Sequence, residues 1–292
     1  MFLQQLINGL ALGSTYALVA VGYSLVFGVL RLINFSNGSL YMLGAYIAMT
    51  VDLALNGNIV LAVIVSLLAT GAAGFAVDFI GLRKLRRDNA PKMAGLISTL
   101  GMSTIIDNLI QIICGTETKK FPDLINLVRF NIGNAILTST QIIMFIVCVA
   151  VMTLFSLVVY KTKIGKSMRA VSQNMVAAKL MGINVKLIIS GTFIVSGIMA
   201  AVAGVLVGAY YHSIETTMAF SVGMKTFAAA VLGGVGSLPG AVIGGLCIGV
   251  AESLGATYIS STFRDGIAFL ILIIVLLFKP TGILGKKAIE KM

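Results

Sequence analysis

The sequence has few charged residues, and this shortage restricts what the protein can be. Asp, Glu, Lys and Arg make up only 11% of its 292 residues, whereas hydrophobic residues make up 58% and the mean hydropathy is +1.03. A soluble domain needs more polar surface than this to cover its core, so the composition excludes one. Because apolar runs extend along the chain, no room remains for a soluble catalytic domain.

Residue types that form metal and redox sites are also scarce. The single His212 cannot form a histidine pair or a His/Cys cluster, and the three cysteines lie in apolar runs without a CxxC spacing. Gly165-Lys166-Ser167 resembles the end of a phosphate-binding loop, but Tyr160 stands where that loop needs a glycine. We therefore expect no enzyme activity, no metal and no cofactor bound by this chain.

The apolar residues form long segments of the length that membrane helices require, about 20 residues each. We expect an all-α, polytopic integral membrane protein: one transmembrane domain over residues 1–292, with about eight or nine transmembrane helices and one segment that is broken or re-entrant. The Gly- and Ala-rich stretch 217–236 is predicted to be either a weak span or a re-entrant segment. The predicted apolar segments cover 2–30, 35–55, 58–81, 94–115, 139–160, 187–210, 217–236, 240–258 and 264–279.

Basic residues are concentrated in four segments between or after these runs. Residues 31–34, 82–93, 161–186 and 279–292 contain 16 of the 21 Lys and Arg residues. The positive-inside rule places these segments in the cytoplasm. This arrangement predicts an external N-terminus, an internal C-terminus and an odd number of crossings, nine if 217–236 spans the membrane.

The segment 161–186 is the one long polar stretch, with six basic residues and no acid. Its apolar residues recur at spacings of three and four, which predicts one short amphipathic helix. Such a helix can dock into a groove on a soluble partner or lie on anionic lipid headgroups. The predicted apolar face consists of Met168, Val171, Met175, Ala178 and Gly182, with Lys166, Arg169, Gln173 and Lys179 mostly away from it.

Ionisable residues inside apolar segments are candidates for a transport pathway. Such a side chain costs about 2.5–3.5 kcal/mol at the bilayer centre on insertion scales, so it normally faces protein or water. Asp107, Lys225 and Glu252 lie well inside these segments. Lys225 and Glu252 could pair across adjacent helices or could line a passage through the membrane. Asp52 and Asp78 lie near segment ends, where we expect their carboxylates to reach the headgroups, and we assign them no role.

The polar break Asn34-Phe35-Ser36-Asn37-Gly38 separates two apolar runs. It is either a simple interfacial turn or a broken helix whose backbone faces a water-filled conduit. In the second case Asn34 and Asn37 would line the substrate pathway.

Pairs of glycines four residues apart recur within the apolar segments. Such pairs let helix backbones approach closely in lipid, either within one chain or across a dimer. The pairs are Gly9/Gly13, Gly204/Gly208, Gly240/Gly244 and Gly245/Gly249.

Several segments resemble the permease subunits of ABC importers for branched-chain amino acids (LIV type). Ala177-Ala178-x3-Gly182 is similar to the "Glu-Ala-Ala, three residues, Gly" signature of their cytoplasmic loop, with Val176 in place of the Glu. Asn37 and Ser39 stand where family members often carry His and Glu, which leaves the substrate open. Further matching segments, in order along nearly the whole chain, are Leu6 to Leu10, Gly13 to Leu18, Ile33 to Gly38, Gly233 to Gly240, Glu252 to Gly255 and Phe278 to Gly282.

The resemblance implies a permease subunit that passes branched-chain or other small amino acids across the bacterial inner membrane. It also implies a second permease subunit (identical or homologous), two cytoplasmic ATPases that bind ATP and Mg, and an extracytoplasmic substrate-binding protein. Alternatives are a permease for urea, amides or another small polar solute, and an ion-coupled secondary transporter. The expected ATPase-coupling residues are Lys166, Arg169, Ala177, Ala178 and Gly182, and the pathway candidates are Asn34, Asn37, Asp107, Lys225 and Glu252.

Overall fold

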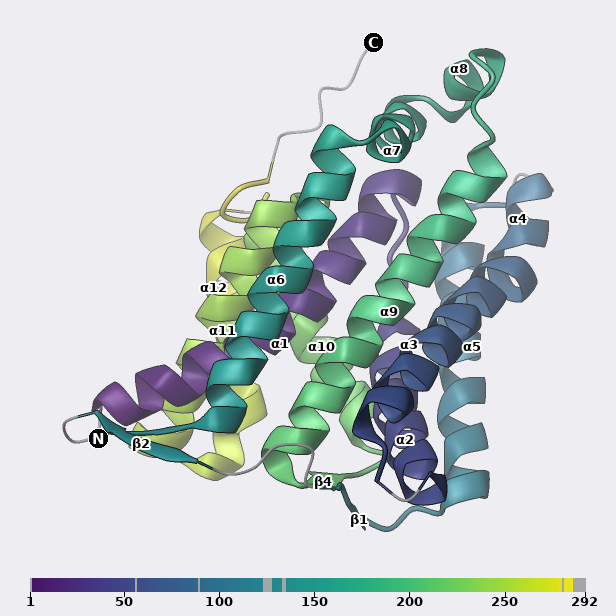
Figure 1. The fold of residues 1–292 in the computed structure, drawn as a ribbon. Coiled ribbons are helices and arrows are strands. Elements are labelled where there is room, and N and C mark those ends of the chain that lie inside the picture. Colours follow the sequence, from purple (N-terminus) through teal and green to yellow (C-terminus); the bar gives the residue numbers. More distant parts are fainter. Residues whose placement is uncertain are drawn as a thin grey trace.

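The protein is a bundle of long apolar helices with a few short strands (Figure 1). A computed structural model describes residues 2–55, 57–88, 90–122, 128–132, 135–279 and 281–285. The predicted all-α membrane class is confirmed, since six helical stretches of the described residues are long and apolar enough to cross a membrane. These stretches are Phe2–Leu30, Ile59–Arg87, Met93–Cys114, Ser139–Lys161, Val185–Tyr211 and Leu238–Tyr258.

The individual elements follow the predicted apolar segments closely, although the expected count of eight or nine crossings stays a prediction. The helices of the bundle are α1 (Phe2–Leu30), α2 (Asn37–Ala54), α3 (Ile59–Ala76), α5 (Lys92–Cys114), α6 (Ser139–Lys161), α9 (Val185–Tyr211), α10 (Met218–Gly233), α11 (Leu238–Tyr258) and α12 (Arg264–Phe278). The remaining elements are the π-helical η1 (Val77–Leu82), α4 (Arg83–Arg87), β1 (Lys119–Lys120), β2 (Arg129–Ile132), β3 (Ala135–Thr138), α7 (Lys163–Gln173), α8 (Met175–Leu180), β4 (Ser213–Ile214) and the 3-10 helix η2 (Ser261–Phe263).

The two ends of the bundle differ in charge. Helices α4, α7 and α8, which come from the predicted basic segments, lie together at one end, and β1, β2 and β4 lie at the other (Figure 1). The pairs β1–β4 and β2–β3 are antiparallel and connect helices at that second end. The grouping of 82–93 with 161–186 on one side therefore agrees with the structure. The basic residues of the predicted tail beyond position 285 lie outside the described residues.

Closely spaced glycines bring α1 and α11 into direct backbone contact. A Cβ atom at Gly249 would lie 2.2 Å from the Cα of Gly13, and one at Gly245 would lie 2.3 Å from the Cα of Ala17. Neither position has room for a side chain, so these glycines set the separation of the two helices. The interpretation of these pairs as contacts within one chain is confirmed.

The polar loop between α6 and α9 forms two short helices, so the prediction of one continuous amphipathic helix is wrong. Asn174 has an extended backbone, with φ −156° and ψ 109°, and its side-chain oxygen accepts hydrogen bonds from the amides of Val176 and Ala177. Asparagine in this position is a favourable N-cap. It ends α7 and starts α8 in a new direction, which the apolar spacing could not reveal.

The expectation that Asp52 and Asp78 reach the lipid headgroups is also wrong. Asp78 is fully buried in η1 and Asp52 is 6% exposed near the end of α2. The Asp78 carboxylate lies inside the protein because Arg86 of α4 and Ser190 of α9 contact it.

Candidate functional site

The loop 161–186 presents its two helices at the basic end of the bundle (Figure 1). Lys166 on α7 and Ala177 on α8 are exposed, whereas Ala178 is buried against the bundle. Gly182 follows α8 with φ +81°, and open space surrounds the position of its missing Cβ. A residue with a side chain rarely adopts this backbone conformation, so Gly182 provides the turn back towards α9. Ala177 is therefore accessible on α8, and the surface beside Gly182 is open.

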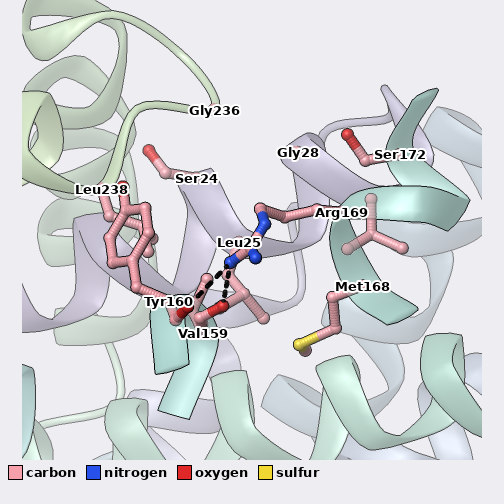
Figure 2. A pocket seen from close by; sticks show the side chains of 11 residues that line it. Ser24, Leu25, Gly28, Val159, Tyr160, Met168, Arg169, Ser172, Gly236 and Leu238 are labelled. Atoms are coloured by element: carbon pink, nitrogen blue, oxygen red, sulfur yellow. Dashed lines mark hydrogen bonds between the residues drawn. The ribbon is translucent and has the colours of Figure 1, made fainter. Parts of the chain in front are cut away.

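Arg169 is exposed on α7, and its head group turns back towards the end of α6. Its guanidinium donates hydrogen bonds to the carbonyl oxygens of Val159 and Tyr160, at the end of α6 (Figure 2). It borders a cavity of about 140 Å³ between α1, α6, α7 and the turn before α11. A cation at the last carbonyls of a helix is favourable. Arg169 therefore fastens α7 to the end of α6.

Lys225 and Glu252 meet in the interior, at the centre of a group of four charged residues. Lys225 Nζ lies 3.0 Å from Glu252 Oε1 and 2.6 Å from Asp265 Oδ1. Glu252 Oε1 also lies 2.5 Å from Arg264 Nε, and Tyr16 donates its phenolic hydrogen to the same oxygen at 3.3 Å. Two positive and two negative charges balance, which offsets the cost of burying Lys225 and Glu252, while the Asp265 side chain is 54% exposed. We call Lys225, Glu252, Arg264 and Asp265 the charge cluster.

The charge cluster connects four helices and keeps one acceptor free. Arg264 Nη2 donates to Tyr211 Oη at 2.7 Å, so the cluster reaches the end of α9 as well as α10, α11 and α12. Glu252 is fully buried, yet its Oε2 has no hydrogen-bond partner among the described residues. An unsatisfied buried carboxylate oxygen is unusual and suits a group that binds a donor from outside the protein.

The polar break between α1 and α2 is buried, so its interpretation as an interfacial turn is wrong. Asn34, Ser36 and Asn37 are each at most 1% exposed. Asn37 Oδ1 accepts a hydrogen bond from Ser196 of α9 at 2.8 Å, and its Nδ2 donates to the carbonyl of Val19 in α1 at 3.4 Å. Because both partners lie in the interior of long helices, the chain returns into the bundle before α2 begins. The non-helical break therefore covers 31–36, whereas Asn37 and Gly38 of the predicted break 34–38 already belong to α2. That this region faces a conduit stays a prediction.

Asp107 does not join the charge cluster. It is half-buried on α5, and its Oδ1 has no hydrogen-bond partner among the described residues. The nearby Ser39 of α2 and Ser103 of α5 share a hydrogen bond of 2.7 Å. The five pathway candidates thus form three separate groups: the break, Asp107 and the charge cluster.

Comparison with known proteins relates these features to a family. The family model described as the permease component of branched-chain amino acid transport systems matches residues 5–276. The chain belongs to this family. It is a permease component of a branched-chain amino acid transport system of the ABC type, and it is a transport subunit and not an enzyme. The expected multi-pass membrane localisation agrees with this assignment.

Individual permeases match along their whole length. The chain is 38% identical over 304 residues to the high-affinity branched-chain amino acid permease LivH of Escherichia coli K12, with 100% of this chain and 98% of that protein covered. It is 40% identical over 303 residues to the permease BraD of Pseudomonas aeruginosa, with the same coverage. The solved structure of PsaBC from Streptococcus pneumoniae in complex with Fab has a similar fold, with a TM-score of 0.51, 14% identity, and 96% of this chain and 93% of that chain covered.

The sequence of the permease did not reveal several residues of these groups. Arg264 and Asp265 stand at the predicted start of a span, where charges are ordinary, and Tyr16 and Ser196 are common polar residues within spans. Only the helix packing brings them next to the residues that were predicted. The one signal in the sequence was that Arg264 and Asp265 are adjacent and opposite in charge. Such a pair can form ion pairs with two opposite charges that are buried nearby.

Proposed function

We propose that this permease imports branched-chain amino acids across the bacterial inner membrane, driven by two cytoplasmic ATPases that bind the loop 161–186. The full-length match to branched-chain permeases is the observation that carries this proposal. The exposed α8, with Ala177 and Gly182 leaving room beside it, supports ATPase binding at this loop. A short helix at the basic end of the bundle has the form of an element that enters a groove on a partner.

The proposed mechanism is a change between two states of the bundle. ATP binding would draw the two ATPases together and move α7 and α8, and Arg169 would transmit this movement to α6 through the carbonyls of Val159 and Tyr160. Direction then comes from the different affinity of the two states for their ligands. A second permease subunit, identical or homologous, and an extracytoplasmic binding protein complete the proposed assembly.

We propose that the charge cluster and the buried break contact the solute. An amino acid carries an ammonium and a carboxylate, and an entirely apolar passage would bind both ends poorly. The free Oε2 of Glu252 supports a contact with the ammonium group, and Lys225 or Arg264 can receive the carboxylate. In the buried break, Nδ2 of Asn34 likewise has no hydrogen-bond partner among the described residues.

The experiment for this proposal uses a substitution on the exposed surface of α8. Ala177→Arg adds a large side chain at an exposed position and leaves the buried Ala178 unchanged. We expect the ATPases to co-purify less with this variant and ATP-dependent leucine uptake to fall. Thr118→Arg, at an exposed position near β1, is the matched control and should keep ATPase binding. Normal ATPase binding and leucine uptake by Ala177→Arg would contradict the proposed docking site.

A further inference from the structure

Asp78 is a fully buried carboxylate that joins two parts of the basic end of the bundle. It lies in η1, on the π-helical turn that links α3 to α4. Its Oδ1 lies 2.5 Å from Arg86 Nη1 of α4, and its Oδ2 accepts a hydrogen bond of 2.6 Å from Ser190 Oγ of α9. Each carboxylate oxygen of Asp78 therefore accepts a hydrogen bond from a different helix, Oδ1 from α4 and Oδ2 from α9.

The turn that carries Asp78 is π-helical. In η1 the amide of Arg83 bonds to the carbonyl of Asp78, five residues earlier, so one extra residue is fitted into the turn. Ser98 Oγ of α5 donates to the carbonyl of Gly81 at 2.6 Å, which satisfies a backbone group in the widened turn. Such turns within α-helices are often found at functional sites.

The partners of Asp78 lie in or beside two of the four basic segments that are predicted to be cytoplasmic, 82–93 and 161–186. Arg86 belongs to the basic helix α4, and its side chain is 24% exposed. Ser190 lies in the second turn of α9, directly after the loop that carries α7 and α8. We infer that Asp78, Arg86 and Ser190 form a clamp that transmits movement of the loop 161–186, through α9, to α3 and α4. This inference rests on the proposed binding of ATPases to that loop.

Burial makes the clamp stiff. A buried carboxylate is stable only while its charge and its hydrogen-bonding capacity are both satisfied, so separating Asp78 from either partner is costly. The helices α3 and α9 also approach closely here, since a Cβ at Gly74 would lie 2.5 Å from the carbonyl oxygen of Phe193. When α9 is displaced at its cytoplasmic end, α3 and η1 must therefore move with it. Asp78 is a positioning residue for transport and does not contact the solute.

The experiment measures how many leucine molecules are imported for each ATP hydrolysed by the complete complex in proteoliposomes. Ser190→Ala removes only the link to α9. We expect ATP hydrolysis to continue while leucine imported per ATP falls about tenfold or more, which is the lower end of the range for one lost hydrogen bond to a charged group. Ser190→Thr keeps the hydroxyl and should restore the ratio. Asp78→Asn should lower the ratio similarly if the variant folds.

A matched control lies two residues away on the same helix. Thr192 is fully buried, and among the described residues its hydroxyl bonds within α9, to the carbonyl of Ile188 at 2.8 Å. Thr192→Ala should therefore keep the wild-type ratio. A wild-type ratio in Ser190→Ala, or a low ratio in Ser190→Thr equal to that of Ser190→Ala, would overturn the clamp. Leucine import by the wild-type complex without ATP would contradict the proposed function rather than the clamp. Because this measurement uses only the wild-type protein, the two failures can be told apart.

Discussion

Lys225 Nζ lies 3.0 Å from Glu252 Oε1 in the interior of the bundle, and neither side chain is more than 6% exposed. The two residues come from neighbouring helices, α10 and α11, and each has a second partner of opposite charge on α12. Their pairing is therefore one part of a neutral group of four charges. This arrangement determines what substitutions at either position will do.

Removing the negative charge of Glu252 should destabilise the permease strongly. Glu252→Gln leaves Lys225 and Arg264 with Asp265 as their one acidic partner in the charge cluster. Breaking a buried ion pair on one side costs about 3–5 kcal/mol. Thermal unfolding of the purified protein in detergent should show a clearly lower melting temperature. Glu117→Gln, at an exposed position, is the control and should melt like the wild type. Equal melting temperatures for both variants would contradict the role of the charge cluster.

Exchanging the charges of Lys225 and Glu252 should not restore folding or transport. In the double variant Lys225→Glu with Glu252→Lys, the cation at position 252 would face Arg264, and the carboxylate at position 225 would face Asp265. Arg264 and Asp265 would then each repel the new side chain beside them, so we expect folding yield and leucine uptake to stay low. Wild-type yield and uptake in the double variant would show that Lys225 and Glu252 form an isolated pair.

The contact between α1 and α11 should not tolerate a larger residue. Gly245→Ala places a methyl group within 2.3 Å of the Ala17 backbone, and overpacking of this kind costs about 1–3 kcal/mol. Gly191→Ala, on α9, meets no atom within 4 Å and is the matched control. We expect a lower melting temperature for Gly245→Ala, whereas Gly191→Ala should be neutral or slightly stabilising because alanine favours helix. Similar stability of the two variants would contradict the helix separation described.

The N-cap of α8 should matter for ATPase binding. Asn174→Ala removes the acceptor for the amides of Val176 and Ala177, at a cost of about 1 kcal/mol to α8. We expect the affinity of the ATPases for the permease to fall several-fold in a direct binding measurement. Asn58→Ala removes a comparable cap from α3 at the opposite end of the bundle and should leave that affinity unchanged. An unchanged affinity for Asn174→Ala would mean that α8 need not be preformed.

A cysteine at position 37 should report whether the buried break faces the conduit. Asn37 is fully buried, so Asn37→Cys should not react with a water-soluble thiol reagent in the resting complex. If the break lines the pathway, trapping the complex with ATP should expose the cysteine and raise its labelling. Thr118→Cys, at an exposed position, should react equally in both states. No change at position 37 would count against a pathway role for this segment.

The membrane architecture could be predicted well from the sequence because lipid imposes a simple rule: each span is one long apolar run. The segments predicted for α1, α6, α9 and α11 therefore agree with the helices within a few residues. The positive charges likewise predicted which loops share one end. Each of these patterns lies within a short stretch of chain, so it can be recognised without knowing which helices pack beside that stretch.

Features that depend on packing could not be predicted in the same way. Asp78 stands near the end of an apolar run, and only the approach of α9 shows that Ser190 covers it. The division of the polar loop depends on the backbone angle of Asn174, which apolar spacing does not encode. Lys225 and Glu252 could be proposed as a pair because few charges occur within the spans. Their partners on α12, Arg264 and Asp265, could not be predicted, because charged residues at the start of a helix can face water and need no ion pair.

The most direct measurement of the central claim is leucine uptake into proteoliposomes that contain this permease, its partner ATPases and the binding protein. We predict accumulation that requires ATP and that is lost when Ala177→Arg blocks α8, while Thr118→Arg retains it. Accumulation without any ATPase, driven by an ion gradient, or full uptake by Ala177→Arg would contradict the account.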